Sequence, residues 1–323
     1  MYQSCRSVVR LACRLIRYKF FNTEKCACGF YLISIGKFLI LYSTELQELP
    51  TNVRADKDLI YAHTDKHQLR LDLYWYPEAV EPVPLIIWVH GGAWRNGTKD
   101  IPIWTTSFWQ GKYAIASIEY RLSHQAIFPA QIKDCKAAVR WLRANAEYYR
   151  IDPYRFGAWG SSAGGHLVAL LGTSGLIDLW EVGDHLHQTS CVQAVCDWFG
   201  PTDFLRMNDV PGEIDHDAFN SPESQLIGGL IQENKGKVAK ANPITYVSTV
   251  APPFLIMHGK LDLTVIKNQS ELLHQALQEK GNSSKLILLD DVAHDFWGVG
   301  ANLRQDILCQ VQSFFDQYLK QDM

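Results

Sequence analysis

The sequence has little excess charge, no repeats and no cysteine framework, and each absence argues against a class of protein. The formal net charge at pH 7 is −3 over 323 residues, so nothing indicates nucleic acid as a partner. No internal repeat or low-complexity tract is visible, which argues against a repeat architecture. With 47% hydrophobic and 20% charged residues, the composition is that of one large globular domain.

The eight cysteines match no disulfide or zinc pattern. Four lie near the N-terminus, where Cys26-x-Cys28 lacks a second pair at zinc-site spacing. The other four fall on apolar faces in the rest of the chain, where we expect buried free thiols: Cys135, Cys191, Cys196 and Cys309. We therefore expect no metal and no organic cofactor.

A serine within a glycine-rich pentapeptide is the first candidate for chemistry. Gly160–Gly164 reads G-x-S-x-G, after an apolar run that ends at Trp159 and before a helical apolar pattern at 167–171. This strand–turn–helix context is typical of a nucleophile elbow, in which a tight turn exposes the central serine. The sequence therefore predicts Ser162 as the nucleophile, with Ser161 pointing into the structure. The alternative is a Gly/Ser turn that caps a helix.

A second glycine-rich loop lies upstream. The apolar run Pro84–Val89 is typical of a strand buried on both faces, and His90-Gly91-Gly92-Ala93-Trp94 follows it directly. This loop resembles the HGGG-type oxyanion loop of esterases and lipases, with Ala93 at the fourth position. We expect the backbone N–H groups of Gly92, Ala93 and Ala163 to form an oxyanion hole, with His90 orienting the loop.

An acid and a histidine complete the pattern. Pro253–His258 reads as a buried strand and is followed by Asp262, while 285–289 reads as a strand followed by His294. Both side chains would lie at the carboxyl ends of strands, where open α/β sheets bind ligands. The order Ser162, Asp262, His294 is that of a hydrolase triad. Asp203 also follows a strand and is the alternative acid.

The chain resembles the α/β-hydrolase family, in the carboxylesterase branch near hormone-sensitive-lipase-like and feruloyl-esterase-like enzymes. Besides the three loops, four segments carry this resemblance, which covers roughly residues 55–320: 119–122, 134–142, 151–155 and 197–203. The sequence departs from the family pattern at Lys260, where an acid is common, and at Asp295, where glycine often follows the histidine. The resemblance implies a mostly parallel sheet with helices on both faces and a small lid insertion at about 204–240.

The activity implied is that of a lipase-like serine esterase, which would cleave small-molecule carboxylic esters through an acyl-enzyme. Two alternatives stay open: an amide hydrolase of the same fold, arylformamidase-like or a peptidase, and a non-catalytic ligand-binding protein. Trp94, Trp198 and Trp297 adjoin the catalytic loops, so we expect them to line an apolar substrate pocket; ordinary core packing is the other interpretation. The sequence indicates no oligomeric state.

Residues 1–50 differ from the hydrolase domain expected over 51–323. Residues 1–25 carry six basic side chains against one acid, a net of +5, and arginines recur every fourth residue from Arg6. This pattern favours a basic amphipathic helix on a membrane surface. The apolar run 29–42 is shorter than the roughly 20 residues of a membrane span. Three interpretations remain: an unstructured extension, membrane-surface contact through residues 1–42, or an export signal. A cytoplasmic location is favoured, with membrane association or export as alternatives.

Overall fold

The computed structural model describes residues 30–35, 38–43, 49–64, 66–101, 108, 112–296 and 298–320. The chain divides into two compact units, Met1–Glu48 and Leu49–Met323. In the first unit, β1 (Phe30–Ile35) and β2 (Phe38–Ser43) form an antiparallel pair in which Phe30 lies opposite Ser43. No secondary structure is assigned to this apolar run from the sequence; its aromatic and β-branched residues favour strands. The basic segment at 6–21 lies outside the described residues.

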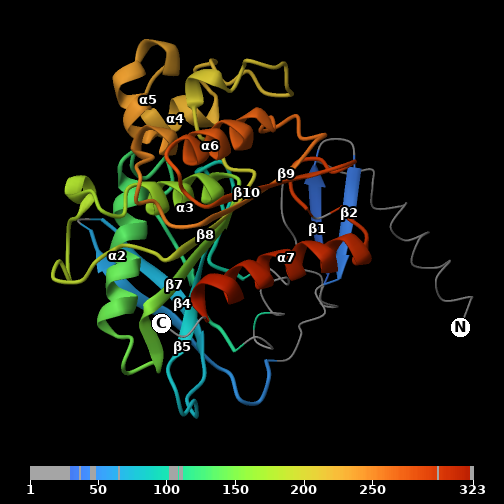
Figure 1. Ribbon diagram of the computed structural model, residues 1–323. Coiled ribbons are helices and arrows are strands. Elements are labelled where there is room, and N and C mark those ends of the chain that lie inside the picture. Colours follow the sequence, from blue (N-terminus) through green and yellow to red (C-terminus); the bar gives the residue numbers. More distant parts are fainter. Residues whose placement is uncertain are drawn as a thin grey trace, which may run out of the picture. The chain divides into compact units, whose positions relative to one another are not determined.

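An eight-stranded sheet forms the centre of the second unit, in the order β10-β9-β8-β7-β5-β6-β4-β3 (Figure 1). Strands β5 to β10 are parallel, whereas β4 runs antiparallel to both of its neighbours, β3 and β6. The strands are β3 (Arg54–His63), β4 (Gln68–Trp75), β5 (Val83–Val89), β6 (Ala114–Ile118), β7 (Ile151–Ser161), β8 (Ala194–Trp198), β9 (Phe254–Gly259) and β10 (Ser284–Leu289).

The predicted strands are confirmed; two of them, β5 and β9, are buried as expected, while β10 is half-buried at the edge of the sheet. The runs expected at 84–89, 253–258 and 285–289 correspond to β5, β9 and β10. Strands β6, β8 and β9 are buried along their whole length, because helices cover the sheet on both faces. Since β5, β7, β9 and β10 are parallel, their carboxyl ends meet at one edge of the sheet. That edge brings together four loops that are far apart in the sequence.

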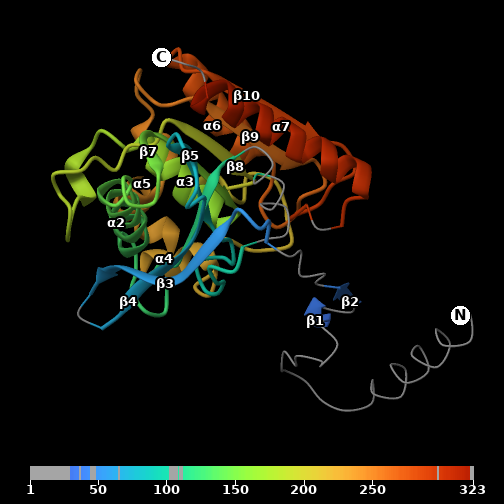
Figure 2. The same ribbon diagram turned by 90° about the horizontal axis from the view of Figure 1, so that it is seen from below.

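Helices cover both faces of the sheet, as predicted. Helices α2 (Ala130–Ala144), α3 (Ala163–Thr173) and α6 (Asn268–Glu279) pack on one face and bury one hydrophobic core. Helix α7 (Ala301–Leu319) covers the other face and a second core (Figure 2). Helical spacing turns the apolar residues of α6 and α7 into these cores: Leu273 and Leu277 into the first, Val311 and Phe314 into the second. No helix among the described residues is long and apolar enough to cross a membrane.

The segment between β8 and β9 holds the short helices of the expected lid. These are α4 (Pro222–Ile227), α5 (Lys235–Ala241) and 3₁₀ turns at Phe204–Arg206 and Ile231–Glu233. Helices α4 and α5 lie together at the top of Figure 1. Helix α4 begins where the Ser221 hydroxyl accepts a hydrogen bond from Ser224 N, and ends at Gly228 in the left-handed region, with φ 76°. The fold is that expected for an α/β-hydrolase with a small insertion.

Candidate active site

The turn between β7 and α3 places Ser162 in a strained backbone conformation, with φ 55° and ψ −120°. Two glycines make this turn possible. A Cβ on Gly164 would lie 2.0 Å from the Val89 carbonyl oxygen, and one on Gly160 would lie 2.4 Å from the Gly164 carbonyl oxygen. Both contacts are with backbone, which cannot move aside, so larger residues are excluded. The G-x-S-x-G pattern therefore reflects the close approach of α3 to β5 and β7.

The elbow serine, the predicted histidine and the predicted acid form one hydrogen-bonded chain. His294 Nε2 lies 3.1 Å from Ser162 Oγ, and His294 Nδ1 lies 2.6 Å from Asp262 Oδ2. The alternative acid, Asp203, lies elsewhere: its Oδ1 accepts hydrogen bonds from Leu205 N at 3.2 Å and from Asn242 Nδ2 at 2.9 Å. Asp203 thus holds the start of the insertion, and Asp262 is the carboxylate beside His294.

Asp262 is buried and accepts hydrogen bonds through both oxygens. Oδ1 accepts from the backbone N–H groups of Thr264 and Val265, each at 2.9 Å. Oδ2 accepts from His294, and His258 Nε2 lies 3.2 Å from it. Burial alone would raise the pKa of Asp262, but hydrogen bonds from His258 and His294 hold that pKa at about 2. The carboxylate is therefore ionised at neutral pH.

His258 is a part of the site that the sequence motifs did not reveal. It stands near the end of β9 and is fully buried, with Nε2 2.7 Å from the Val265 carbonyl oxygen and Nδ1 2.7 Å from Ser270 Oγ. Because a carbonyl accepts, Nε2 carries the proton and points toward the Asp262 turn. A signal existed in the sequence: a polar histidine interrupts an otherwise apolar strand four residues before the acid.

The loop after β5 lies against the elbow. Gly92 and Ala93 both have left-handed backbones, with φ of 108° and 55°, and a Cβ on Gly91 would lie 2.8 Å from the Ser161 carbonyl oxygen. Among the described residues, none accepts a hydrogen bond from the N–H groups of Gly92, Ala93 or Ala163. Ala163 is the first residue of α3, so its N–H adds the positive end of the helix dipole. These three donors are free to bind an anion.

His90 stabilises this loop rather than facing the serine. Its ring stacks on Tyr120 at 4.3 Å, its Nδ1 lies 2.7 Å from the Gly91 carbonyl oxygen, and Tyr120 donates to the His90 carbonyl. Burial lowers the pKa of His90 to about 4, so the ring is neutral near pH 7. The placement agrees with the orienting role expected from the sequence.

A small hollow of about 40 Å³ opens beside Ser162. Trp94 contributes one wall and is almost fully buried; its indole N–H donates to His166 Nδ1 at 3.2 Å. The insertion contributes another wall, through Ile214, His216, Pro222 and Glu223. His166 Nε2 lies 2.8 Å from the Ala241 carbonyl oxygen, so this buried histidine joins the elbow helix to the end of the insertion.

Of the three tryptophans predicted to line the substrate pocket, only Trp94 is found in the wall of the hollow among the described residues. Trp198 is buried in the core on the α7 face, with its ring centroid 4.8 Å from that of Trp159, and it does not line the hollow. Its backbone instead helps to hold the elbow turn, because the Trp198 carbonyl accepts a hydrogen bond from Ser162 N at 2.8 Å. The core interpretation therefore holds for this side chain. Trp297 lies outside the described residues.

Phe199 and Asp295 adopt left-handed backbones near the triad, with φ of 46° and 64°. The Phe199 ring contacts His294 edge-on, with centroids 4.9 Å apart, and is buried. A bulky residue in this region is strained, and such strain is concentrated at functional sites. Asp295 has the left-handed backbone that glycine adopts most readily, and aspartate is among the other residues that tolerate it.

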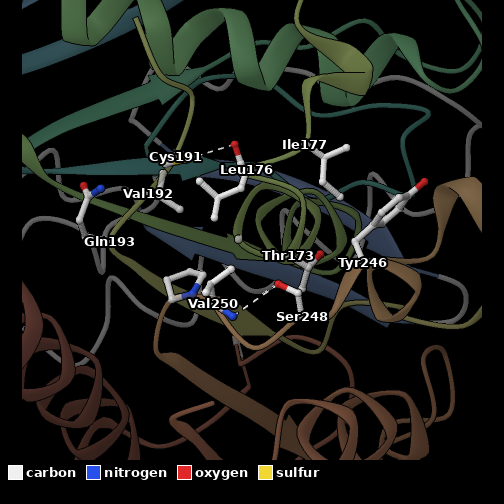
Figure 3. Close-up of a pocket in the computed structure, with 12 residues that line it drawn as sticks. Thr173, Leu176, Ile177, Cys191, Val192, Gln193, Tyr246, Ser248 and Val250 are labelled. Atoms are coloured by element: carbon white, nitrogen blue, oxygen red, sulfur yellow. Dashed lines mark hydrogen bonds between the residues drawn. The ribbon is translucent and has the colours of Figure 1, made fainter. Parts of the chain in front are cut away.

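A larger hollow of about 320 Å³ lies at the opposite edge of the sheet, where β8 and β9 begin (Figure 3). Its polar side chains are used within the protein. Gln193 Oε1 accepts from Phe156 N, Tyr246 donates to the Lys240 carbonyl, and Cys191 Sγ contacts the Gly175 carbonyl at 3.1 Å. The smaller hollow, beside Ser162, is therefore the candidate active site.

The cysteines follow the expectation in part. Cys135 and Cys196 are buried free thiols, but Cys191 is half-buried and Cys309 is exposed on α7, contrary to the expectation of burial. Cys309 is exposed because it lies on the outer side of an amphipathic helix.

Within the described part of the chain, no group of three or more histidine, cysteine or acidic side chains could hold a metal ion.

Comparison with known proteins decides the family. The profile of the family described as BD-FAE matches residues 71–277, which include both glycine-rich loops and Asp262. The chain belongs to the BD-FAE family. The resemblance to the carboxylesterase branch of the α/β-hydrolases is thereby confirmed.

Relatives of this BD-FAE chain are named as esterases. Esterase LipQ of Mycobacterium tuberculosis is 29% identical over 264 residues, which is 80% of this chain and 61% of LipQ. Carboxylesterase NlhH of the same species is 34% identical over 101 residues, 31% of this chain and 32% of NlhH. The chain thus spans less than two thirds of the length of these curated relatives.

Solved structures agree on the α/β-hydrolase fold. A truncated carbohydrate esterase from gut microbiota is 30% identical with a TM-score of 0.74, and the match covers 83% of this chain and 97% of that one. An esterase from Thermogutta terrifontis has a TM-score of 0.66 at 22% identity, with 83% and 92% covered, and shares the fold.

Proposed function

We propose that this protein is a serine hydrolase that cleaves carboxylic esters through an acyl-enzyme intermediate. The observation that carries the proposal is the chain Ser162–His294–Asp262, with hydrogen-bonding distances of 3.1 and 2.6 Å, at the carboxyl edge of the sheet. A serine hydroxyl is a weak nucleophile at neutral pH, and a hydrogen-bonded histidine oriented by a carboxylate is what activates it. The esterase names of the relatives point to the same chemistry.

The first half-reaction forms the acyl-enzyme. His294 takes the Ser162 proton on Nε2 as Oγ attacks the ester carbonyl, and then gives it to the leaving alcohol. Asp262 keeps the His294 proton on Nδ1 and stabilises the imidazolium, because its own pKa of about 2 leaves it ionised. Water then attacks the acyl-enzyme with His294 again as the base, and releases the acid.

The negative charge that develops on the carbonyl oxygen needs donors in place before the reaction. The N–H groups of Gly92, Ala93 and Ala163 are free of acceptors among the described residues, and Ala93 and Ala163 line the hollow beside Ser162. One such donor is typically worth about 3 kcal/mol of the barrier. Because these donors are backbone atoms on rigid turns, little reorganisation is needed as charge builds up.

The substrate is proposed to be a small-molecule ester. The hollow beside Ser162 is walled by Trp94, Ile214, Pro222 and Val265, so it offers mainly apolar contact to the acyl group. The amide-hydrolase alternative uses the same triad, and its test belongs in the same panel of substrates. None of the catalytic groups in this proposal comes from residues 1–48.

A labelling experiment tests the proposal directly. A fluorophosphonate probe should react with Ser162 and not with Ser161, as read by peptide mapping, and p-nitrophenyl acetate should be hydrolysed. Ser162→Ala should abolish both. A substrate panel that adds N-formylkynurenine separates an esterase from an arylformamidase-like enzyme. Absence of labelling and of ester turnover in the folded protein would refute the proposed function.

A further inference from the structure

A buried histidine of the insertion contacts the turn that carries the triad acid. His216 lies before α4, and its side chain is almost fully buried. Nδ1 lies 2.9 Å from Glu223 Oε2, and Nε2 lies 3.1 Å from the Thr264 carbonyl oxygen. A carbonyl must accept, so Nε2 donates to Thr264. A carboxylate also accepts, so His216 is held between two acceptors from different parts of the fold.

The Thr264 peptide is also one of the groups that hold the acid. The Thr264 N–H donates to Asp262 Oδ1 at 2.9 Å, while the Thr264 carbonyl accepts from His216. His258 Nε2 donates a hydrogen bond to the neighbouring carbonyl of Val265 at 2.7 Å. Two histidines outside the triad thus fasten the two residues whose N–H groups orient Asp262. Of these two, His216 alone comes from the insertion.

The same contact closes the wall of the hollow. His216, Glu223 and Thr264 all line the hollow beside Ser162. A further backbone hydrogen bond, from Glu213 N to the Leu263 carbonyl at 2.7 Å, joins the insertion to the acid turn a few residues away. The insertion and the acid turn are therefore one connected structure at the point where an acyl group would bind.

We propose that His216, paired with Glu223, is a positioning residue that ties the insertion to the Asp262 turn and thereby orients the triad acid toward His294. The inference rests on the proposed function, because the orientation of Asp262 matters to the reaction when Ser162 is the nucleophile and His294 its base. His216 acts through Thr264: its ring nitrogens contact Glu223 and the Thr264 carbonyl, not Ser162, His294 or Asp262. Small displacements of catalytic groups lower the reaction rate strongly, so loss of the single hydrogen bond from His216 to Thr264 should lower kcat measurably.

Two substitutions of His216 test its two hydrogen bonds separately. His216→Asn places an amide N–H near the former Nδ1, where it keeps the bond to Glu223 and loses the bond to Thr264. His216→Gln reaches the former Nε2 position and keeps the bond to Thr264. His274→Gln is the matched control: His274 is partly buried on α6, bonded to Ser284 Oγ at 2.8 Å, at the start of β10 and far from the catalytic edge of the sheet.

The readout is kcat and KM for p-nitrophenyl acetate together with the melting temperature of the full chain. We expect kcat to fall about tenfold in His216→Asn, with a smaller change in KM, to fall clearly less in His216→Gln, and to stay within about 1.5-fold of wild type in the control. A purely structural role would lower melting temperature and activity together in both variants. Equal loss in the two His216 variants, or no loss in His216→Asn, overturns the proposal.

Glu223→Gln covers the case in which His216→Asn does not fold. The amide oxygen still accepts from Nδ1, so the packing is kept while the negative charge on the pair is removed. We expect kcat to fall about threefold, and an unchanged kcat overturns the proposal. If the wild-type protein shows neither ester turnover nor fluorophosphonate labelling, the proposed function fails instead, before any variant is compared.

Discussion

Replacing Asp262 with asparagine is the sharpest test of the triad. The carboxylate has four donors around it: two backbone N–H groups at Oδ1 and the side chains of His294 and His258 at Oδ2. An amide offers one acceptor oxygen and one NH₂ group. Whichever way it is turned, its NH₂ faces two donors, so the substitution disrupts half of this arrangement while changing the volume little.

The catalytic cost follows from which proton His294 carries. With the NH₂ group toward His294, Nδ1 becomes an acceptor, and the proton moves to Nε2, where it faces Ser162 and blocks base catalysis. The equivalent change in another triad enzyme lowers kcat about 10⁴-fold, and the same order is expected here. At about 1.4 kcal/mol per tenfold, this is roughly 5 kcal/mol of barrier. Leaving buried donors unpaired should also lower the free energy of unfolding by about 1–3 kcal/mol.

The assay is hydrolysis of p-nitrophenyl acetate, with the melting temperature as a measure of folding. Asp203→Asn is the matched control, because Asp203 also follows a sheet strand but bonds to Leu205 N and Asn242. The control should keep most of its activity. An Asp262→Asn enzyme with more than about a tenth of the wild-type rate, or an Asp203→Asn enzyme that loses as much, would refute the assignment of the acid.

Four further predictions follow from the same geometry. Ser162→Ala should abolish turnover and fluorophosphonate labelling with an unchanged circular dichroism spectrum; label found on Ser161 would contradict the elbow. Gly164→Ala should destabilise the fold by about 1–3 kcal/mol or more and inactivate it, since its Cβ would lie 2.0 Å from a β5 carbonyl oxygen; a stable, active variant in denaturant titration would oppose this. The lowered pKa of Asp262 means that its carboxylate adds stability above its ordinary pKa, and that this stability is lost as pH falls toward about 2; melting temperatures of wild type and Asp262→Asn should therefore converge in acid. A chain beginning at Pro50 should fold and keep activity on a soluble ester, and loss of solubility or activity on truncation would contradict this. If the arginine-rich segment forms the expected amphipathic helix, the full chain should additionally bind anionic vesicles in low salt; equal vesicle binding by both chains would favour the unstructured extension.

Much of the candidate site was predictable because its motifs are local. The elbow depends on steric limits within five residues, so Gly160 and Gly164 indicate it without any tertiary information. The buried strands are recognisable from apolar runs, and the chain order of Ser162, Asp262 and His294 then places each at the carboxyl end of a strand. Short-range sterics and periodicity are properties of the sequence itself, and these expectations agree with the structure.

Other features depend on which distant segments meet, and no local pattern encodes that. The sequence places Trp198 next to a catalytic loop, but the register of β8 against β7 turns its ring into the core on the α7 face. Alternate side chains of a strand point to opposite faces, so adjacency to a loop does not tell which face a side chain takes. The pair at 30–43 was missed because an apolar run of that length suits a strand pair as well as a single apolar segment.

The sequence by itself determined the class of fold, the elbow turn and the chain order of the proposed triad residues, because local sterics and apolar periodicity suffice for these. Only the tertiary structure decided the supports: His258 and Phe199 beside the triad, and His216 reaching from the insertion to the Thr264 carbonyl. These contacts join segments tens of residues apart, and a buried histidine finds its partners only when the packing of those segments removes it from water. The physical origin of the difference is range: covalent geometry acts between neighbours, whereas burial and hydrogen-bond pairing depend on the whole fold.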